Sequence, residues 1–106
     1  MPELDSVDVL TRLADRLGEG HRLTPAERAE VLRIAQGMAC KASAAIASVA
    51  PETIRARRKR IYRKLGMSGA IDVISSLLAS ALHDLAGERL AERHGDPAEI
   101  RAGATR

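Results

Sequence analysis

The sequence predicts an all-α protein with one small domain. Aliphatic residues recur at three- and four-residue intervals in several stretches, which is the periodicity of amphipathic helices, and no stretch has the pattern of a strand. A chain of 106 residues is long enough for a core of a few helices. That core must be aliphatic, because the chain has no Phe, no Trp and a single Tyr.

The first predicted helix covers residues 4–17 and is acidic and amphipathic. Gly18 and Gly20 are expected to end it, so that residues 1–22 form a helix and a short linker. An isolated helix of this length is marginal in water, so we expect it to pack on its own chain or on a partner subunit. Its apolar stripe consists of Leu4, Val7, Leu10, Leu13, Ala14 and Leu17.

Two shorter helices are predicted over residues 24–36 and 40–47. Thr24 is expected to be the N-cap of the first, with Pro25 in the first turn and Glu27 completing a capping box. Gly37 is expected to end it. The second helix, CKASAAIA, is rich in small residues and leads into a turn before Pro51.

A helix over residues 51–65 is predicted to end at Gly66, and one over 69–84 follows it. Residues 85–106 are expected to extend the last helix by a turn or two and to fray beyond Gly95. The apolar set of this helix is wider than one core-facing stripe needs, which predicts a dimer interface. An alternative is that the whole set packs within one chain, partly against residues 4–17. The set consists of Ile71, Ile74, Leu77, Leu78, Ala81, Leu82 and Leu85.

The basic charge of the protein is concentrated in RARRKRIYRK, residues 55–64. Seven of these ten residues are Lys or Arg, whereas the rest of the chain holds 10 basic and 14 acidic residues. On a helix, Ile54, Ile61 and Leu65 form a narrow apolar stripe, and the opposite face is cationic around Ala56.

Duplex DNA is the partner that this helix fits best. A solvated face usually mixes both charge signs, a membrane-surface helix needs a wide apolar face, and single-strand RNA readers need several aromatic residues. A cationic helix enters the major groove, where Arg and Lys reach guanine edges and phosphates.

Other functional classes find little support in the sequence. His21, His83 and His94 share no metal-ligand spacing with Cys40, and no phosphate loop or nucleophile motif is present, so we expect neither enzyme activity nor a metal or cofactor. With a single cysteine, no apolar run of about 18 residues and no signal-peptide pattern, a cytoplasmic protein without a membrane span is expected. Redox sensing by Cys40 remains a minor alternative.

Residues 23–84 resemble the LuxR-type helix-turn-helix domain, also called the GerE or FixJ type. The features in register are Leu23-Thr24-Pro25 with Glu27, Val31-Leu32, Gly37, Lys41, Thr53-Ile54, Ile61 and Lys64-Leu65-Gly66. The resemblance implies a four-helix DNA-binding domain, here with an extra N-terminal helix, in which 40–47 is the scaffold helix, 51–65 the recognition helix and 69–84 the dimerisation helix.

The resemblance also implies roles for individual residues. Base contacts fall on Arg55, Ala56 and Lys59. Phosphate contacts fall on Lys41, Thr53, Arg57, Arg58, Arg60, Arg63 and Lys64.

Three features depart from the family pattern. Ser43 and Ala47 occupy positions where larger apolar residues are usual, and Ile46 is expected to turn inward in compensation. Arg57 replaces a family His. About 22 residues precede the motif, as in stand-alone members of the family.

The functional prediction is therefore a transcriptional regulator that binds duplex DNA as a homodimer. The rival is a helix-turn-helix-derived interaction module that binds a regulator or RNA polymerase instead of operator DNA. Ser43 and Ala47 in the scaffold helix and the acidic residues 4–17 motivate this rival.

Overall fold

The computed structural model describes residues 6–94, and that range contains five α-helices and no strand. They are α1 (Ser6–His21), α2 (Pro25–Ala35), α3 (Cys40–Ala47), α4 (Pro51–Leu65) and α5 (Ala70–His94). The predicted all-α class is confirmed. Residues 95–106, where fraying is predicted, lie outside the described residues.

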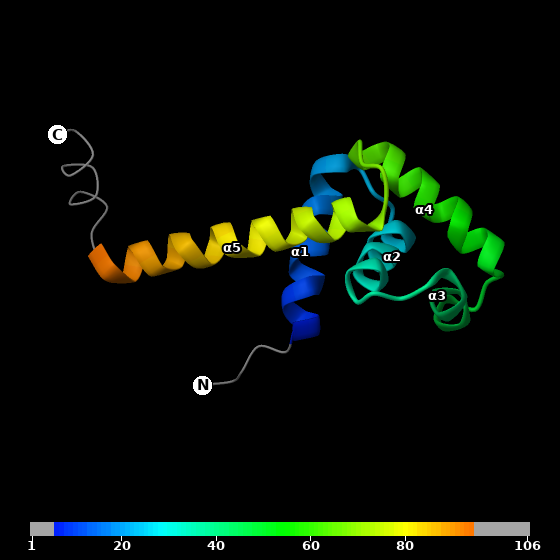
Figure 1. The fold of residues 1–106 in the computed structure, drawn as a ribbon, viewed down its shortest axis with the longest axis horizontal. Coiled ribbons are helices and arrows are strands. Elements are labelled where there is room, and N and C mark those ends of the chain that lie inside the picture. The colour runs from blue at the N-terminus through cyan, green and yellow to red at the C-terminus, as the bar shows by residue number, and fades with distance from the viewer. Residues whose placement is uncertain (1–5, 95–106) are drawn as a thin grey trace.

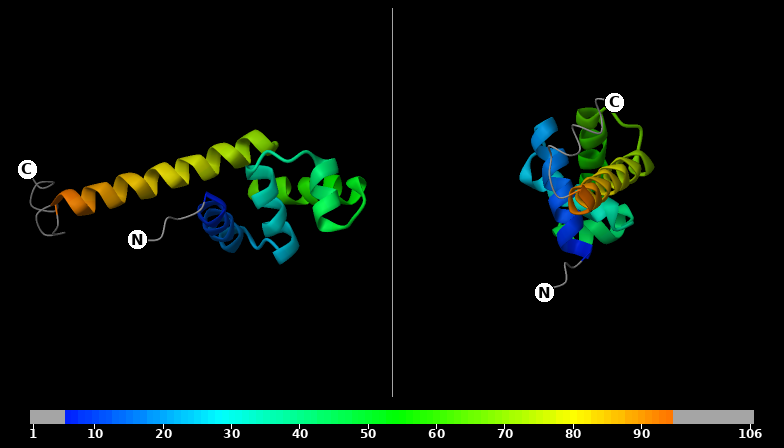
Figure 2. Two further views of the ribbon diagram at one scale, coloured as in Figure 1. Left: turned by 90° about the horizontal axis from the view of Figure 1, so that it is seen from below. Right: turned by 90° about the vertical axis from the view of Figure 1, so that its left-hand side faces the viewer.

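The second helix is the centre of the fold. It contacts α1, α4 and α5, while α3 packs on α4. In Figure 1, α3 and α4 lie at one end of the molecule, and the C-terminal half of α5 projects from the other end. The view from below in Figure 2 shows the same projection. The far half of α5 thus extends beyond the other helices.

Four of the helices and one loop residue build a single aliphatic core. Two of its members, Leu13 and Ala14, belong to α1, which confirms that the N-terminal helix packs on its own chain. The other members are Leu23, Val31, Ile34, Ile61, Leu65, Val73 and Leu77.

The first helix ends later than predicted. The prediction that Gly18 and Gly20 end it is wrong, because α1 continues to His21. Gly18 packs closely against α2: a Cβ at this position would lie 2.7 Å from Cγ of Arg28, so the Arg28 side chain would have to shift. The chain leaves the helix at Arg22, whose φ is 57°, and the amide of Leu23 donates a hydrogen bond to the carbonyl of Gly18 at 3.1 Å.

The next three helices agree with the predicted ranges to within one residue. The capping box of α2 is confirmed, since the amide of Glu27 donates to Thr24 Oγ1 at 3.1 Å and the amide of Thr24 donates to Glu27 Oε1 at 2.8 Å. The predictions of 40–47 for α3 and 51–65 for α4 are confirmed. Gly66 ends α4 in the left-handed conformation, with a φ of 67°.

The last helix is longer than the predicted 69–84. It begins at Ala70, where Asp72 Oδ2 accepts a hydrogen bond from the amide of Ser68 at 2.8 Å, and it runs to His94. Residues 70–87 are also long and apolar enough to cross a membrane, which corrects the expectation that no such run exists. One helix of this kind is weak evidence for a membrane span, and Val73 and Leu77 from the same stretch are buried in the core.

Candidate nucleic-acid interface

The helix α4 follows α3 after a three-residue turn. Ser48 makes this turn in the left-handed conformation, with a φ of 58°, and Pro51 occupies the first turn of α4, a position that favours proline. Ile54, Ile61 and Leu65 are buried, as the sequence predicts, and they attach one side of α4 to the rest of the protein. The opposite side of α4 is therefore turned to solvent.

The predicted base-reading residues lie together on this outward face. Arg55, Ala56 and Lys59 are exposed, and so is Arg63 two turns after Ala56. Lys59 and Arg63 form no ion pair or side-chain hydrogen bond with any residue in the described range. Their charges are thus not neutralised within the chain. Hereafter the outward face means Arg55, Ala56, Lys59 and Arg63.

A buried carboxylate fixes the inner edge of α4. Glu30, on α2, has a fully buried side chain, and its Oε2 accepts a hydrogen bond from Arg58 Nε at 2.8 Å. Its Oε1 accepts from Arg33 Nη2 at 2.9 Å and from the Ser43 hydroxyl at 2.6 Å. Arg58 also donates to the carbonyl of Met38 at 2.7 Å. This Glu30 cluster joins α2, α3 and α4 through charge-assisted bonds.

The bonds around Glu30 outweigh its desolvation. Burial by itself raises the pKa of Glu30, but the hydrogen bonds from Ser43, Arg58 and Arg33 lower it further than burial raises it. The net pKa is below the ordinary value of 4.5, so the group is a carboxylate at neutral pH. A buried ion pair with full hydrogen bonding specifies one arrangement of the helices.

Glu27 makes a second link between α2 and α4. Lys64 Nζ lies 2.7 Å from Glu27 Oε1, and Arg60 Nε lies 3.9 Å from Oε2 of the same carboxylate. Burial raises the pKa of Glu27, and the bonds from Lys64 and from the amide and hydroxyl of Thr24 bring it below its ordinary value. Glu27 therefore both completes the capping box of α2 and neutralises charge on the basic segment.

These two links change the roles predicted for the basic residues. The prediction that Arg58 contacts phosphate is wrong, because its side chain is only 11% exposed and its guanidinium is bonded to Glu30 and Met38. Lys64 is held by Glu27 and acts first as a link between helices. Arg60 keeps half of its side chain exposed, and Arg57 is half-buried. Of the remaining predicted phosphate contacts, Lys41 on α3 and Thr53 at the start of α4 are exposed.

The short helix α3 is held by polar contacts that the sequence did not predict. Ser43 stands where a larger apolar residue is usual, but it is fully buried and bonded to Glu30 and Arg33. The expectation that Ile46 turns inward is wrong, since 60% of this residue is exposed. The sequence contains part of this signal, because a small polar residue, Ser43, stands at a position that is usually apolar. Its partner Glu30 lies 13 positions away and could not be identified from spacing.

The apolar face of α5 divides into an inner and an outer part. Leu77 is buried in the core of its own chain, so its assignment to a dimer interface is wrong. Ala81 is half-buried. The remaining predicted interface residues are exposed, namely Ile71, Ile74, Leu78, Leu82 and Leu85.

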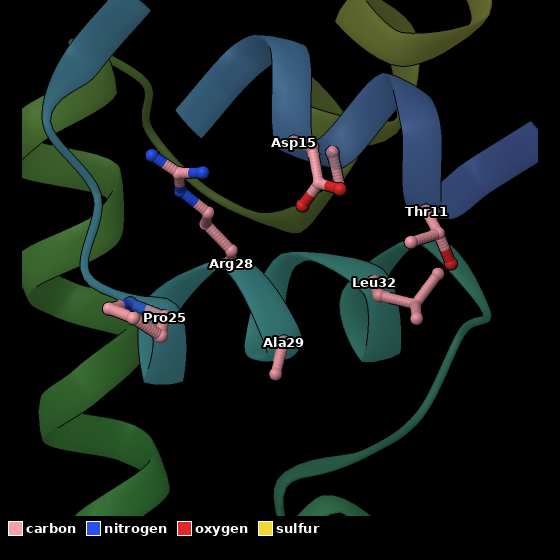
Figure 3. Close-up of a pocket in the computed structure, with 7 residues that line it drawn as sticks. Thr11, Asp15, Pro25, Arg28, Ala29 and Leu32 are labelled. Atoms are coloured by element: carbon pink, nitrogen blue, oxygen red, sulfur yellow. The ribbon is translucent and has the colours of Figure 1, made fainter. Parts of the chain in front are cut away.

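Surface depressions border α1 both on its side towards α5 and on its side towards α2. One, of about 400 Å³, lies between α1 and α5 and is almost wholly apolar, with Val9 and Leu10 on one side and Ile74 and Leu78 on the other. Another lies between α1 and α2 (Figure 3), where Thr11 and Asp15 face Pro25, Arg28 and Leu32. Within residues 6–94, no three His, Cys, Asp or Glu side chains are grouped as metal ligands.

Comparisons with protein-family models, with curated proteins and with solved structures find no match for this chain.

Proposed function

We propose that this protein is a sequence-specific, duplex-DNA-binding transcriptional regulator of the LuxR type, acting as a homodimer in the cytoplasm. In this proposal α3 and α4 form the helix-turn-helix and α4 enters the major groove. The protein has no catalytic role of its own. RNA polymerase or another regulator is a further partner of the DNA-bound dimer.

The observation that carries the proposal is the polarity of α4. Its inner side is buried and bonded to two carboxylates of α2, whereas Lys59 and Arg63 on the outward face have no anion in the described chain. Like charges on one exposed helix face repel one another. A polyanion relieves this repulsion, and a helix with one cationic face fits the width of the major groove.

The positions of the residues on α4 support separate roles in base contacts and in phosphate contacts. Arg55 and Ala56 lie in the N-terminal half of α4 and Lys59 lies at its middle. The N-terminal part of a recognition helix is the part that meets base edges. We assign phosphate contacts to the cations around them and to the hydroxyl of Thr53. These cations are the exposed Lys41, Arg60 and Arg63 and the half-buried Arg57.

Dimerisation is assigned to the outer part of α5. Leu78, Leu82 and Leu85 are each more than half exposed on a helix that extends beyond the other four. The apolar depression lined by Val9, Leu10, Ile74 and Leu78 is continuous with this stripe because Leu78 belongs to both. Isologous pairing about a two-fold axis covers such a surface and sets two recognition helices on one duplex.

Binding of a labelled mixed-sequence duplex at low salt tests the proposal. The unmodified chain should bind, and a Lys59→Ala, Arg63→Ala double variant should bind at least several-fold more weakly, because it loses one proposed base contact, one proposed phosphate contact and two positive charges that face the polyanion. Arg12→Ala, which removes one exposed cation from α1, is the control and should bind like the unmodified chain. Equal binding by the double variant would rule out α4 as the interface.

The second candidate function is a protein-interaction module without operator DNA. The exposed leucines of α5 and the depression beside α1 favour it, since such surfaces mark protein partners. The scaffold helix no longer favours it, because Ser43 is bonded within the Glu30 cluster. Failure of the unmodified chain to bind any duplex at low salt would support this candidate.

A further inference from the structure

One carboxylate stands among the cations of the outward face. Glu52, in the first turn of α4, has a side chain that is 83% exposed and is paired with the guanidinium of Arg55. At about 100° per residue, Glu52 projects between Arg55 and Arg63 and within about 20° of Lys59. It lies in the surface proposed to meet DNA.

A carboxylate in this position weakens general attraction to DNA. It neutralises Arg55 in the free protein, and phosphate groups repel it in a complex. An acidic residue in a first turn also interacts favourably with the helix dipole, but that effect concerns stability alone. The ion pair also affects base contacts by Arg55. When Arg55 contacts a base, either the pair breaks or Glu52 enters the groove together with Arg55.

Base edges offer a partner for each member of the pair. In the major groove, guanine presents two acceptors that suit Arg, whereas cytosine N4 and adenine N6 are amines that donate to a carboxylate. A carboxylate beside such an amine exchanges its hydrogen bonds to water for a hydrogen bond to the base. A carboxylate beside a base acceptor loses its hydrogen bonds to water and gains none. The carboxylate therefore distinguishes sites according to the base beside Arg55.

We propose, on the basis of the DNA-binding function proposed above, that Glu52 is a specificity-determining residue that accepts a hydrogen bond from the exocyclic amine of a cytosine or adenine. Arg55, oriented by Glu52, reads an adjacent guanine. Sites without the amine are penalised by the unpaired carboxylate. Glu52 thus lowers affinity for random sequence and raises the ratio of specific to random binding.

Selection from a randomised duplex pool tests this inference. The unmodified chain, Glu52→Ala and Glu52→Gln are each used to select sites, and affinities for selected and random duplexes are then measured. Glu19→Gln, which removes an exposed carboxylate from α1, is the matched control for net charge. Circular dichroism of each variant establishes that it is folded.

We expect Glu52→Ala to bind random duplex several-fold more tightly and to lose a cytosine or adenine preference of roughly fivefold or more at one position. Glu19→Gln should keep both properties of the unmodified chain. Selection of the same site by Glu52→Ala, with an unchanged ratio of specific to random affinity, overturns the inference. Failure of the unmodified chain to bind any duplex overturns the proposed function itself, which is a different result.

Discussion

The two buried carboxylates of α2 bind side chains of α4 and so add polar links to the apolar contacts that hold this helix. Glu30 receives Arg58 from α4, Arg33 from its own helix and Ser43 from α3. Among the described residues, every buried side-chain nitrogen or oxygen has a hydrogen-bond partner. Such a cluster tolerates the loss of one member poorly, because the remaining charges stay buried without a counter-ion.

Glu30→Ala should therefore destabilise the fold by about 3–5 kcal/mol, since it leaves Arg33 and Arg58 without their anion. Urea denaturation followed by circular dichroism measures the change. Glu19→Ala, at an exposed position of α1, should stay within about 0.5 kcal/mol of the unmodified chain. A loss below about 1 kcal/mol for Glu30→Ala would mean that the cluster does not hold α4.

Acid should weaken the same links. The pKa values of Glu27 and Glu30 in the folded chain lie below the ordinary value of 4.5, so their contribution to stability is complete above about pH 4.5 and is lost as the pH falls through the folded pKa values. The urea midpoint should decline below that pH. Glu30→Gln, which has no proton to gain at this position, should show a shallower decline. Parallel curves for the two proteins would contradict the assignment.

Local contacts of single residues could be predicted from the sequence, and distant ones could not. The capping box of Thr24 and Glu27 spans three positions, so its spacing alone identifies it. The bond from Arg58 to Glu30 spans 28 positions and that from Ser43 spans 13. Helical periodicity gives no information on how α4 rotates against α2, so it does not distinguish the inward Arg58 from the cations of the outward face.

The helix α4 has one side that is attached to the rest of the protein and an opposite side that is exposed. Ile54 and Arg58 belong to the anchored side, and Arg55 and Lys59 to the outward face. If α4 binds DNA as proposed, this separation lets base contacts and stability change independently. Arg58→Ala should therefore destabilise the fold, unlike substitutions on the outward face.

Arg55→Ala or Lys59→Ala should cost about 1–3 kcal/mol of binding to a selected site and relax preference at one base position, because a bidentate base contact is lost. Arg63→Ala should weaken binding to all sequences alike, as a phosphate contact does. Competition assays with single-base variants of the site distinguish the two effects. Equal relaxation of specificity by all three variants would contradict the division of roles.

The inner and outer parts of α5 can be separated with two neighbouring substitutions. Leu77→Glu places a charge in the buried core and should unfold the chain, whereas Leu78→Glu should leave a folded monomer that binds DNA weakly. Circular dichroism and sedimentation velocity report the two properties. If both variants unfold, or both remain dimeric, α5 is not the interface.

The boundaries of α4 could be predicted from the sequence because Pro and Gly mark them. Pro51 and Gly66 enclose α4, and both of its predicted ends are confirmed. The end of α1 was missed because Gly18 serves close packing against Arg28 and not termination, a distinction that needs the neighbouring helix. The periodicity of α5 likewise did not show which leucines the core would use.

The surface proposed for DNA binding and the surface proposed for dimerisation lie on different parts of the molecule. The basic helix α4 lies with α3 at one end, and α5 carries its exposed leucines away from them (Figure 1). The N-terminal helix belongs to the same unit, because Leu13 and Ala14 complete the core. A dimer formed through α5 would present two copies of α4 to one duplex, with phosphate contacts from both subunits.

The dependence of duplex affinity on salt tests this account most directly. If the dimer neutralises on the order of 6–10 phosphates, log K should fall against log salt concentration with a slope of about −5 to −9. Fluorescence anisotropy over a range of salt concentrations gives the slope. A slope shallower than about −2 would contradict the assignment of α4 as a DNA-binding helix.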